Sequence, residues 1–208
     1  MVLIEAAVES LDAARAAAEG GAQRLELCAQ LALGGLTPDV TLLQACRSQL
    51  TLPSFVLIRP RAGDFVYSHV EYRTMLDQIA DAKAAGAQGI VTGALTKSNE
   101  IAEAQVSALI AAARPLPVTF HRAIESCVDL SRALETLIGL GVDRILASGT
   151  SCVGQLVKQS NGRITILAGG GITADNVAQL VRETGVREIH FSVRDAGKVR
   201  AIIANAKD

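Results

Sequence analysis

A repeated joint, the connection from the end of a helix to the next strand, decides the fold. Its first copy reads Gly21-Ala22-Gln23-Arg24-Leu25-Glu26-Leu27. A glycine ends a helical segment, a small apolar residue and a two-residue turn follow, and a short strand begins. The pattern recurs as Gly86-Ala87-Gln88-Gly89-Ile90-Val91, Gly141-Val142-Asp143-Arg144-Ile145-Leu146 and Gly185-Val186-Arg187-Glu188-Ile189-His190. Four such joints predict a chain made of repeated strand and helix units.

Four more strand-like runs lie between these joints, so the sequence predicts eight strands, starting near residues 2, 24, 55, 89, 117, 143, 163 and 188. Helical patterns such as residues 10–19 and 173–183 follow the strands. Units of about 26 residues fit a (β/α)8 TIM-type barrel, a single α/β domain over residues 1–208. A doubly wound open sheet is the alternative, but residues 5–9 lack the glycine-rich turn that it needs.

Composition excludes several classes of function. The 20 Lys and Arg nearly cancel the 21 Asp and Glu, and no long run of either sign indicates binding to nucleic acid or to an acidic membrane surface. No uncharged apolar run approaches a membrane span, and no signal peptide is recognisable, so we expect a cytoplasmic protein with reduced cysteines. A homo-oligomer that covers apolar area is compatible with the net charge of −1.

If the barrel closes, the strand ends bring distant polar residues to one rim. The predicted rim residues are Glu5, Glu26, Cys28, Arg59, Arg61, Thr92, His121, Ser148, Gly169 and His190. Burying an unpaired carboxylate or guanidinium costs several kcal/mol, so these side chains must pair or meet a ligand. One reading is a structural ion-pair network of Glu5, Glu26 and Arg59, and the other is a ligand site.

As a ligand site, the rim predicts acid–base chemistry on a small anionic substrate, phosphorylated or carboxylated and sugar-like. Glu5 or Glu26 would be the base and His121 the acid partner. The predicted anion-binding residues are Arg59, Arg61, Gly169, Gly170, Gly171 and His190. Two alternatives stay open: the glycines form only a tight turn, or the arginines only bind Asp64 and order their loop.

A metal site is the other hypothesis. Cys28 is placed at the rim, and a soft thiolate beside an imidazole suits Cu(I) or Zn(II). The sequence therefore predicts Cys28 and His121 as candidate metal ligands.

Several segments together resemble the CutC copper homeostasis family. They are residues 26–28, 34–38, 58–68, 91–93, 119–123, 148–149 and 190–192, with Arg59-Pro60-Arg61 and Phe120-His121-Arg122-Ala123 the most specific. The resemblance implies a TIM-type barrel, a cytoplasmic location and copper handling with Cu(I) as the bound ion. In the family pattern a cysteine follows the first-strand glutamate, whereas this chain has Ala6 and Ala7 and a shorter loop after Ser192. Cys28 is then the expected rim thiolate.

Overall fold

Eight parallel strands close into a barrel in the order in which they occur along the chain. The computed structural model describes residues 2–206, so residues 1, 207 and 208 of the predicted domain lie outside the described part. The strands are β1 (Leu3–Val8), β2 (Arg24–Leu27), β3 (Ser54–Leu57), β4 (Gly89–Thr92), β5 (Val118–Phe120), β6 (Arg144–Ser148), β7 (Thr165–Gly169) and β8 (Glu188–Ser192). Pairing of β1 with both β2 and β8 completes the ring.

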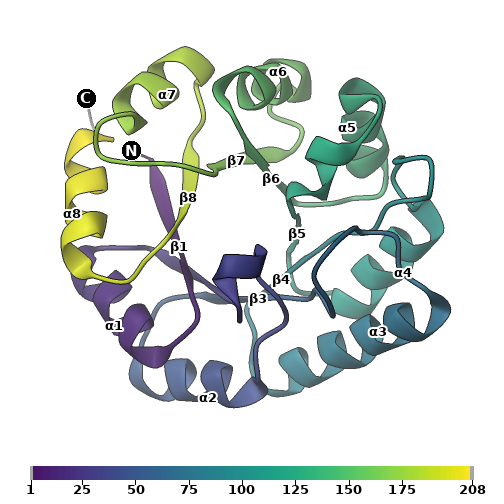
Figure 1. Ribbon diagram of the computed structural model, residues 1–208, viewed down its shortest axis with the longest axis horizontal. Coiled ribbons are helices and arrows are strands. Elements are labelled where there is room, and N and C mark those ends of the chain that lie inside the picture. The colour runs from purple at the N-terminus through teal and green to yellow at the C-terminus, as the bar shows by residue number, and fades with distance from the viewer. Residues whose placement is uncertain (1, 207–208) are drawn as a thin grey trace.

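A helix follows each strand and lies on the outside of the barrel, as Figure 1 shows. The helices are α1 (Leu11–Gly20), α2 (Val40–Gln49), α3 (His69–Ala84), α4 (Glu103–Ala113), α5 (Leu130–Gly139), α6 (Thr150–Ser160), α7 (Val177–Thr184) and α8 (Ala196–Asn205). Two 3-10 helices, η1 (Leu31–Leu33) and η2 (Arg122–Ser126), follow β2 and β5. The predicted (β/α)8 barrel is confirmed, and the open sheet is excluded. No helix in residues 2–206 combines the length and the apolar character that crossing a membrane requires.

The four glycine joints have the predicted geometry. Gly21, Gly86, Gly141 and Gly185 all adopt positive φ angles, between 70° and 96°, which a side chain would disfavour. Each of them thus ends a helix and turns the chain into the next strand. One helix start was predicted wrongly: α7 begins at Val177 rather than at Thr173, because Thr173 belongs to a turn in which its amide donates to the Asn176 side chain.

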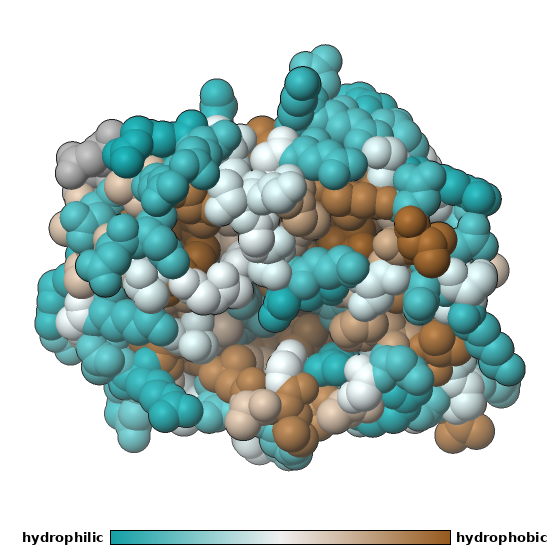
Figure 2. Space-filling view, turned by 45° about the horizontal axis from the view of Figure 1, so that its top comes forward, coloured by the Kyte–Doolittle hydropathy of each residue, from teal (hydrophilic) through white to brown (hydrophobic). Residues whose placement is uncertain are grey.

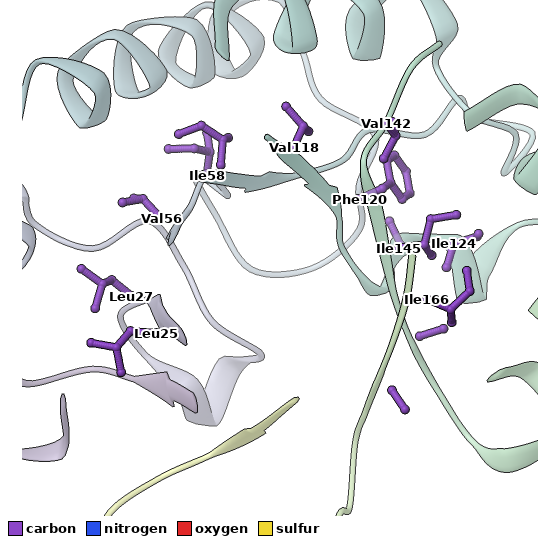
Figure 3. Packing of buried hydrophobic residues seen from close by; sticks show 14 of the residues in the cluster. Leu25, Leu27, Val56, Ile58, Val118, Phe120, Ile124, Val142, Ile145 and Ile166 are labelled. Atoms are coloured by element: carbon purple, nitrogen blue, oxygen red, sulfur yellow. The ribbon is translucent and has the colours of Figure 1, made fainter. Parts of the chain in front are cut away.

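Alternation along the strands separates two environments. Outward-facing residues such as Leu25, Leu27, Val56 and Ile58 join the main apolar core between strands and helices, part of which is drawn in Figure 3. Inward-facing residues fill the barrel itself, and many of them are charged or polar. The fold therefore places its ionisable side chains in the narrow interior, where each must find a partner.

An aromatic ring fills one level of this interior. The Phe55 ring lies between two guanidinium groups, with Arg144 Cζ 4.2 Å and Arg24 Cζ 5.2 Å from the ring centroid. On the neighbouring strand Gly89 leaves the space for the ring, because a Cβ atom added there would lie 2.2 Å from Phe55 Cε2. The ring and the two arginines thus fill the space beneath the rim.

We expect Gly89→Ala to destabilise the fold by about 1–3 kcal/mol, because the added methyl group overpacks the barrel against Phe55. Urea denaturation measures this loss. Gly139→Ala is the matched control, since nothing lies within 4 Å of a Cβ atom added at that helical position. Equal stabilities of the two variants would contradict the packing of the ring.

Candidate functional site

A cavity of about 630 Å³ opens at the carboxyl ends of the strands. Of the predicted rim residues, Glu26, Arg59, His121 and His190 line it, together with Gly170 and Gly171. Helix η1, which contributes two leucines to the wall, lies over the barrel mouth in Figure 1. In Figure 2 the molecule is hollowed near its centre, where hydrophilic residues stand beside hydrophobic ones. The cavity is large enough for a sugar-sized ligand.

Glu5 is completely buried below this cavity and is fully paired. Its Oε1 lies 2.7 Å from His190 Nδ1, and its Oε2 accepts from Arg24 Nε. Arg24 also contacts Glu188, so one guanidinium joins the two carboxylates. Burial by itself would raise the pKa of Glu5, but the hydrogen bond and charge of His190, together with Arg24, lower it to about 2. Glu5 is therefore a permanent anion that orients His190.

Glu26 lies at the cavity wall in a different state. It is 5% exposed, its Oε2 has no hydrogen-bond partner, and its Oε1 is 4.0 Å from His190 Nε2. Burial raises the pKa of this carboxyl to about 7 against the attraction of His190. A carboxyl group with such a pKa can both accept and return a proton near neutrality.

His190 connects the two carboxylates. Desolvation would lower the pKa of His190, but the charges of Glu26 and Glu5 and the hydrogen bond that His190 donates to Glu5 raise it overall. Because Glu5 occupies Nδ1, the Nε2 atom faces Glu26 at the cavity wall. The arrangement is a buried carboxylate, an oriented imidazole and a second carboxyl group that can exchange a proton.

His121 lines the same cavity as a neutral group. Its Nδ1 accepts a hydrogen bond from the amide of Ala123 at 3.3 Å, so Nε2 carries the hydrogen, and Nε2 is buried without a partner. Burial, and then the charge of Arg59, lower the pKa of His121 to about 3. Near pH 7 this side chain can donate a hydrogen bond but has no extra proton to give.

Arg59 also lines the cavity, but it does not join Glu5 and Glu26 in an ion-pair network. Its Nη1 donates to the carbonyls of Leu33 and Gly35 at 3.1 and 3.0 Å, and its Nη2 donates to that of Gly63 at 2.9 Å. These bonds hold η1 and the loop after β3 at the barrel mouth. The network of the barrel interior instead contains Glu5, Arg24, Glu188 and His190.

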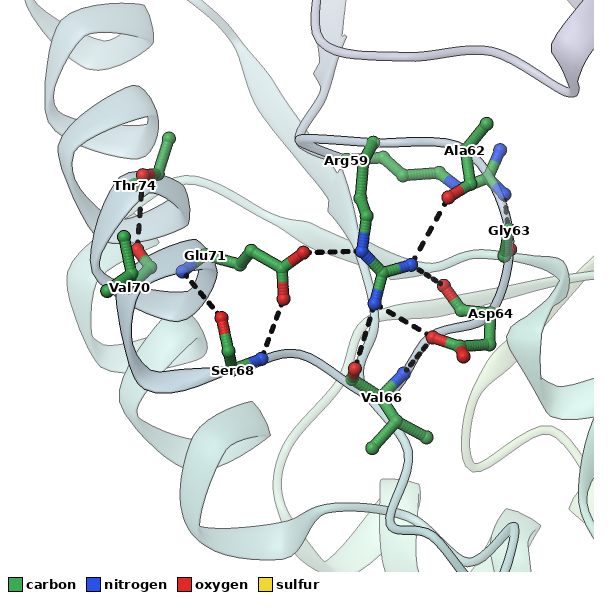
Figure 4. A network of polar contacts seen from close by, with 10 residues as sticks. Arg59, Ala62, Gly63, Asp64, Val66, Ser68, Val70, Glu71 and Thr74 are labelled. Atoms are coloured by element: carbon green, nitrogen blue, oxygen red, sulfur yellow. Dashed lines mark hydrogen bonds and ion pairs between the residues drawn. The ribbon is translucent and has the colours of Figure 1, made fainter.

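Arg61 is placed differently from Arg59 and does not line the cavity. Its guanidinium bonds the carboxylates of Glu71 and Asp64 and the carbonyl of Val66, the last two at 2.8 and 2.9 Å. Figure 4 shows Glu71, Asp64 and Val66 gathered in this network. The contacts favour the alternative in which the arginine orders its own loop, and anion binding by Arg61 stays a prediction.

Cys28 is buried inside the barrel below the cavity wall. It packs with Ala7, Phe55, Leu57 and Val91, and its Sγ donates to the Val8 carbonyl at 3.5 Å. Burial, and then the charge of Glu26, raise the pKa of the Cys28 thiol, which disfavours the thiolate that binds copper.

One group of three possible metal ligands occurs in residues 2–206: Glu5, Glu26 and His190, whose ligand atoms lie within 4.8 Å of one another. Two carboxylates and an imidazole form a hard, thiol-free set, whereas Cu(I) prefers soft sulfur ligands. This three-residue group thus does not suit Cu(I). Cys28 and His121 as Cu(I) ligands stay a prediction.

The glycine turn after β7 is close-packed at Gly169 and Gly170, whereas nothing lies within 4 Å of a Cβ atom added at Gly171. Gly170 and Gly171 have φ angles of 74° and 71°, and a Cβ atom added at Gly170 would lie 2.7 Å from Ser148 Cβ. Gly169 faces Leu146 Cδ1, which would lie 2.8 Å from an added Cβ atom. These contacts support the alternative of a tight turn, and anion binding by the three glycines stays a prediction.

Sequence reasoning missed three contributors. Arg24 could have been found, because it lies two residues before Glu26 and therefore shares the inward face of β2. Lys198 lines the cavity from the first turn of α8, with its Nζ donating to the Ser192 carbonyl at 2.8 Å, and a search confined to strand ends overlooks it. Phe65 lines the wall from the loop after β3, with its ring centroid 4.8 Å from that of His121.

The fold and the cavity define a (β/α)8 barrel protein whose pocket, at the carboxyl ends of the strands, is lined by ionisable residues. The chain belongs to the CutC family, whose model matches residues 2–195. The resemblance seen in the sequence is thereby confirmed.

Relatives and a solved structure agree with this assignment. A family protein CutC of Glaesserella parasuis serovar 5 (strain SH0165) is 45% identical over 92% of this chain and 82% of its own length. The human copper homeostasis protein cutC homolog is 43% identical over 92% of this chain and 73% of its own length. The crystal structure of a copper homeostasis protein CutC from Streptococcus agalactiae superimposes with a TM-score of 0.85 at 34% identity, covering 92% of this chain and 98% of that chain.

We expect Glu26→Gln to become more stable relative to wild type as pH rises. The raised pKa means that folded Glu26 keeps its proton up to about pH 7, whereas the unfolded chain loses it near 4.5. Wild type therefore loses stability as pH rises through this window, and the amide does not. The expected change in the difference is about 2–3 kcal/mol between pH 5 and pH 8.5, measured by urea denaturation.

Glu19→Gln serves as the control, because the Glu19 side chain is 71% exposed on the surface. Its stability should follow wild type at both pH values. If Glu26→Gln and wild type keep a constant difference from pH 5 to pH 8.5, the raised pKa of Glu26 is contradicted.

Proposed function

We propose that this protein is an enzyme that moves a proton on a small anionic substrate bound in the barrel mouth. The observation that carries the proposal is the Glu26 carboxyl group, buried at the cavity wall with Oε2 unpartnered and Oε1 4.0 Å from His190 Nε2. A carboxyl group without a hydrogen-bond partner costs stability, and a substrate is the partner that the cavity can admit.

Glu26, His190 and Glu5 each have a distinct role in this mechanism. Glu26 takes the proton from the substrate and returns it, because its pKa of about 7 matches that exchange. His190 stabilises the ionised form of Glu26 through its own charge. Glu5, held by Arg24, is a positioning residue that keeps Nε2 of His190 directed at Glu26.

Two cations support an anionic substrate. Arg59 and Lys198 line the cavity, and within residues 2–206 neither forms an ion pair with a carboxylate. Arg122 also lines the cavity, but its Nε and Nη2 atoms donate to the Glu125 carboxylate at 2.8 and 2.9 Å. A carboxylate or phosphate of the substrate would balance the charges of Arg59 and Lys198.

We expect the wild-type protein to catalyse deuterium incorporation into at least one member of a panel of small phosphorylated and carboxylated sugars and hydroxy acids. Proton NMR in D2O measures the rate. Glu26→Gln should lower that rate by about 10²–10⁴-fold, because the amide cannot accept the proton.

Glu19→Gln is again the control, since the Glu19 side chain is 71% exposed and does not line the cavity. Its rate should equal that of wild type. No incorporation and no product with any member of the panel, or equal rates for Glu26→Gln and wild type, would contradict the proposed function.

Cu(I) binding at the rim is the second candidate. The mouse and human relatives favour it, since both are named copper homeostasis protein cutC homolog. The candidate ligands are Cys28 and His121. Against it stand the apolar packing of Cys28 and the thiol-free composition of the described ligand group. The copper role is stated only in the names of relatives, whereas the geometry of this chain supports the enzyme hypothesis more directly.

We expect the protein to bind Cu(I) only with a micromolar or weaker Kd, equal in wild type and Cys28→Ser, because a buried thiol with a raised pKa is a poor ligand. Anaerobic titration against a strong competing chelator measures the affinity. Much tighter binding that Cys28→Ser abolishes would establish the copper site instead.

The compartment that we propose is the cytoplasm. All four cysteines are free in the structure, and Cys28 and Cys46 are buried. Unpaired thiols are typical of a reducing compartment. Assembly into a homo-oligomer stays a prediction.

A further inference from the structure

We propose that the group which reacts in the substrate is a carbonyl, and that His121 is a catalytic residue whose Nε2–H binds the carbonyl oxygen. The reaction class is then proton transfer at the carbon next to the carbonyl, on a small hydroxy-carbonyl compound with an anionic group. This inference rests on the proposed function, since it needs Glu26 as the base.

The hydrogen bonding of His121 fixes the position of its proton. The Ala123 amide donates to Nδ1, which leaves the hydrogen on Nε2. The residue lines the cavity and is 5% exposed. Its Nε2 atom is buried and has no hydrogen-bond partner. A buried donor without an acceptor destabilises the fold, so this N–H requires an acceptor that the described residues do not supply.

The imidazole ring is held rigidly. Its centroid is 4.8 Å from that of Phe65 and 5.7 Å from that of Phe120. A Cβ atom added at Gly93 would lie 2.7 Å from His121 Cε1, so only a glycine leaves the ring this space. The main-chain amide of His121 donates to the Thr92 carbonyl at 3.0 Å. A donor fixed before the substrate arrives needs no reorganisation during the reaction.

The electrostatic surroundings keep this donor neutral. Burial and the nearby charge of Arg59 lower the pKa of His121 to about 3, so Nε2 presents one hydrogen and no full charge across the neutral pH range. In the same cavity, Oε2 of the Glu26 carboxyl group accepts no hydrogen bond from the described residues. A fixed neutral donor and a base are the two groups that forming an enolate requires.

The proposed step is balanced without any other reactant. The Glu26 carboxylate takes the proton from the carbon next to the carbonyl, and the electron pair of that C–H bond forms a C=C bond. The π pair of the C=O bond moves onto oxygen, which accepts a hydrogen bond from His121 Nε2–H. Return of the proton from Glu26 to the same carbon restores the carbonyl and the free carboxylate.

The test compares two ligands, phosphoglycolohydroxamate, which mimics the planar enolate, and the matching amide, phosphoglycolamide. Isothermal titration measures Kd for wild type, His121→Gln, which keeps an N–H donor, and His121→Phe, which has none. We expect wild type to prefer the hydroxamate, and His121→Phe to weaken hydroxamate binding by about 100-fold while weakening amide binding far less. His121→Gln should lie between the two.

His69→Phe is the matched control, because His69 is exposed at the start of α3 and does not line the cavity. Its affinities should equal those of wild type. A second measurement needs no substitution: in 15N-labelled wild-type protein, the hydroxamate should shift the His121 Nε2–H resonance, and Nδ1 should stay unprotonated.

Three results would overturn the inference: no preference of wild type for the hydroxamate, equal weakening of both ligands in His121→Phe, or an unchanged Nε2–H resonance. These failures differ from failure of the proposed function. Glu26-dependent deuterium incorporation at a carbon without a neighbouring carbonyl would leave the proposed function standing and exclude this reaction class.

Discussion

The structure depends on a carboxylate that has no access to water. Glu5 is completely buried, and such a charge is tolerated only when it is paired and hydrogen-bonded. Its partners come from the strands on either side, Arg24 from β2 and His190 from β8, so the pairing spans the place where the barrel closes. The same contacts that satisfy the charge also orient an imidazole toward the cavity, and structural and functional requirements therefore coincide at Glu5.

Burial shifts the pKa values of two ionisable groups at the cavity wall in opposite directions. Glu26 has no cationic hydrogen-bond partner, and burial raises its pKa to about 7, whereas His121 lies near Arg59 and becomes neutral. A base that titrates near neutrality and a donor that does not titrate there are complementary. Their complementarity arises from low solvent exposure together with the charges placed beside each group.

The family name and the geometry emphasise different chemistry. Relatives are named for copper homeostasis, but the described residues of this chain bring together two carboxylates and an imidazole, while Cys28 packs against apolar side chains. Strand β1 has Ala6 and Ala7 after Glu5 and contributes no thiol. A group of two carboxylates and an imidazole does not suit Cu(I), which prefers soft sulfur ligands.

The sequence by itself determined the repeated helix-to-strand joints, the eight strands within about two residues of their starts, the family, and the strand ends that carry Glu26, His121 and His190, because these depend on local periodicity and on motifs. Only the tertiary structure decided which charges pair. Glu5 and His190 are 185 positions apart along the chain, and Arg61 turned away from the cavity that Arg59 lines. Partner choice and the pKa shifts depend on distance and burial, and closure of the barrel sets both.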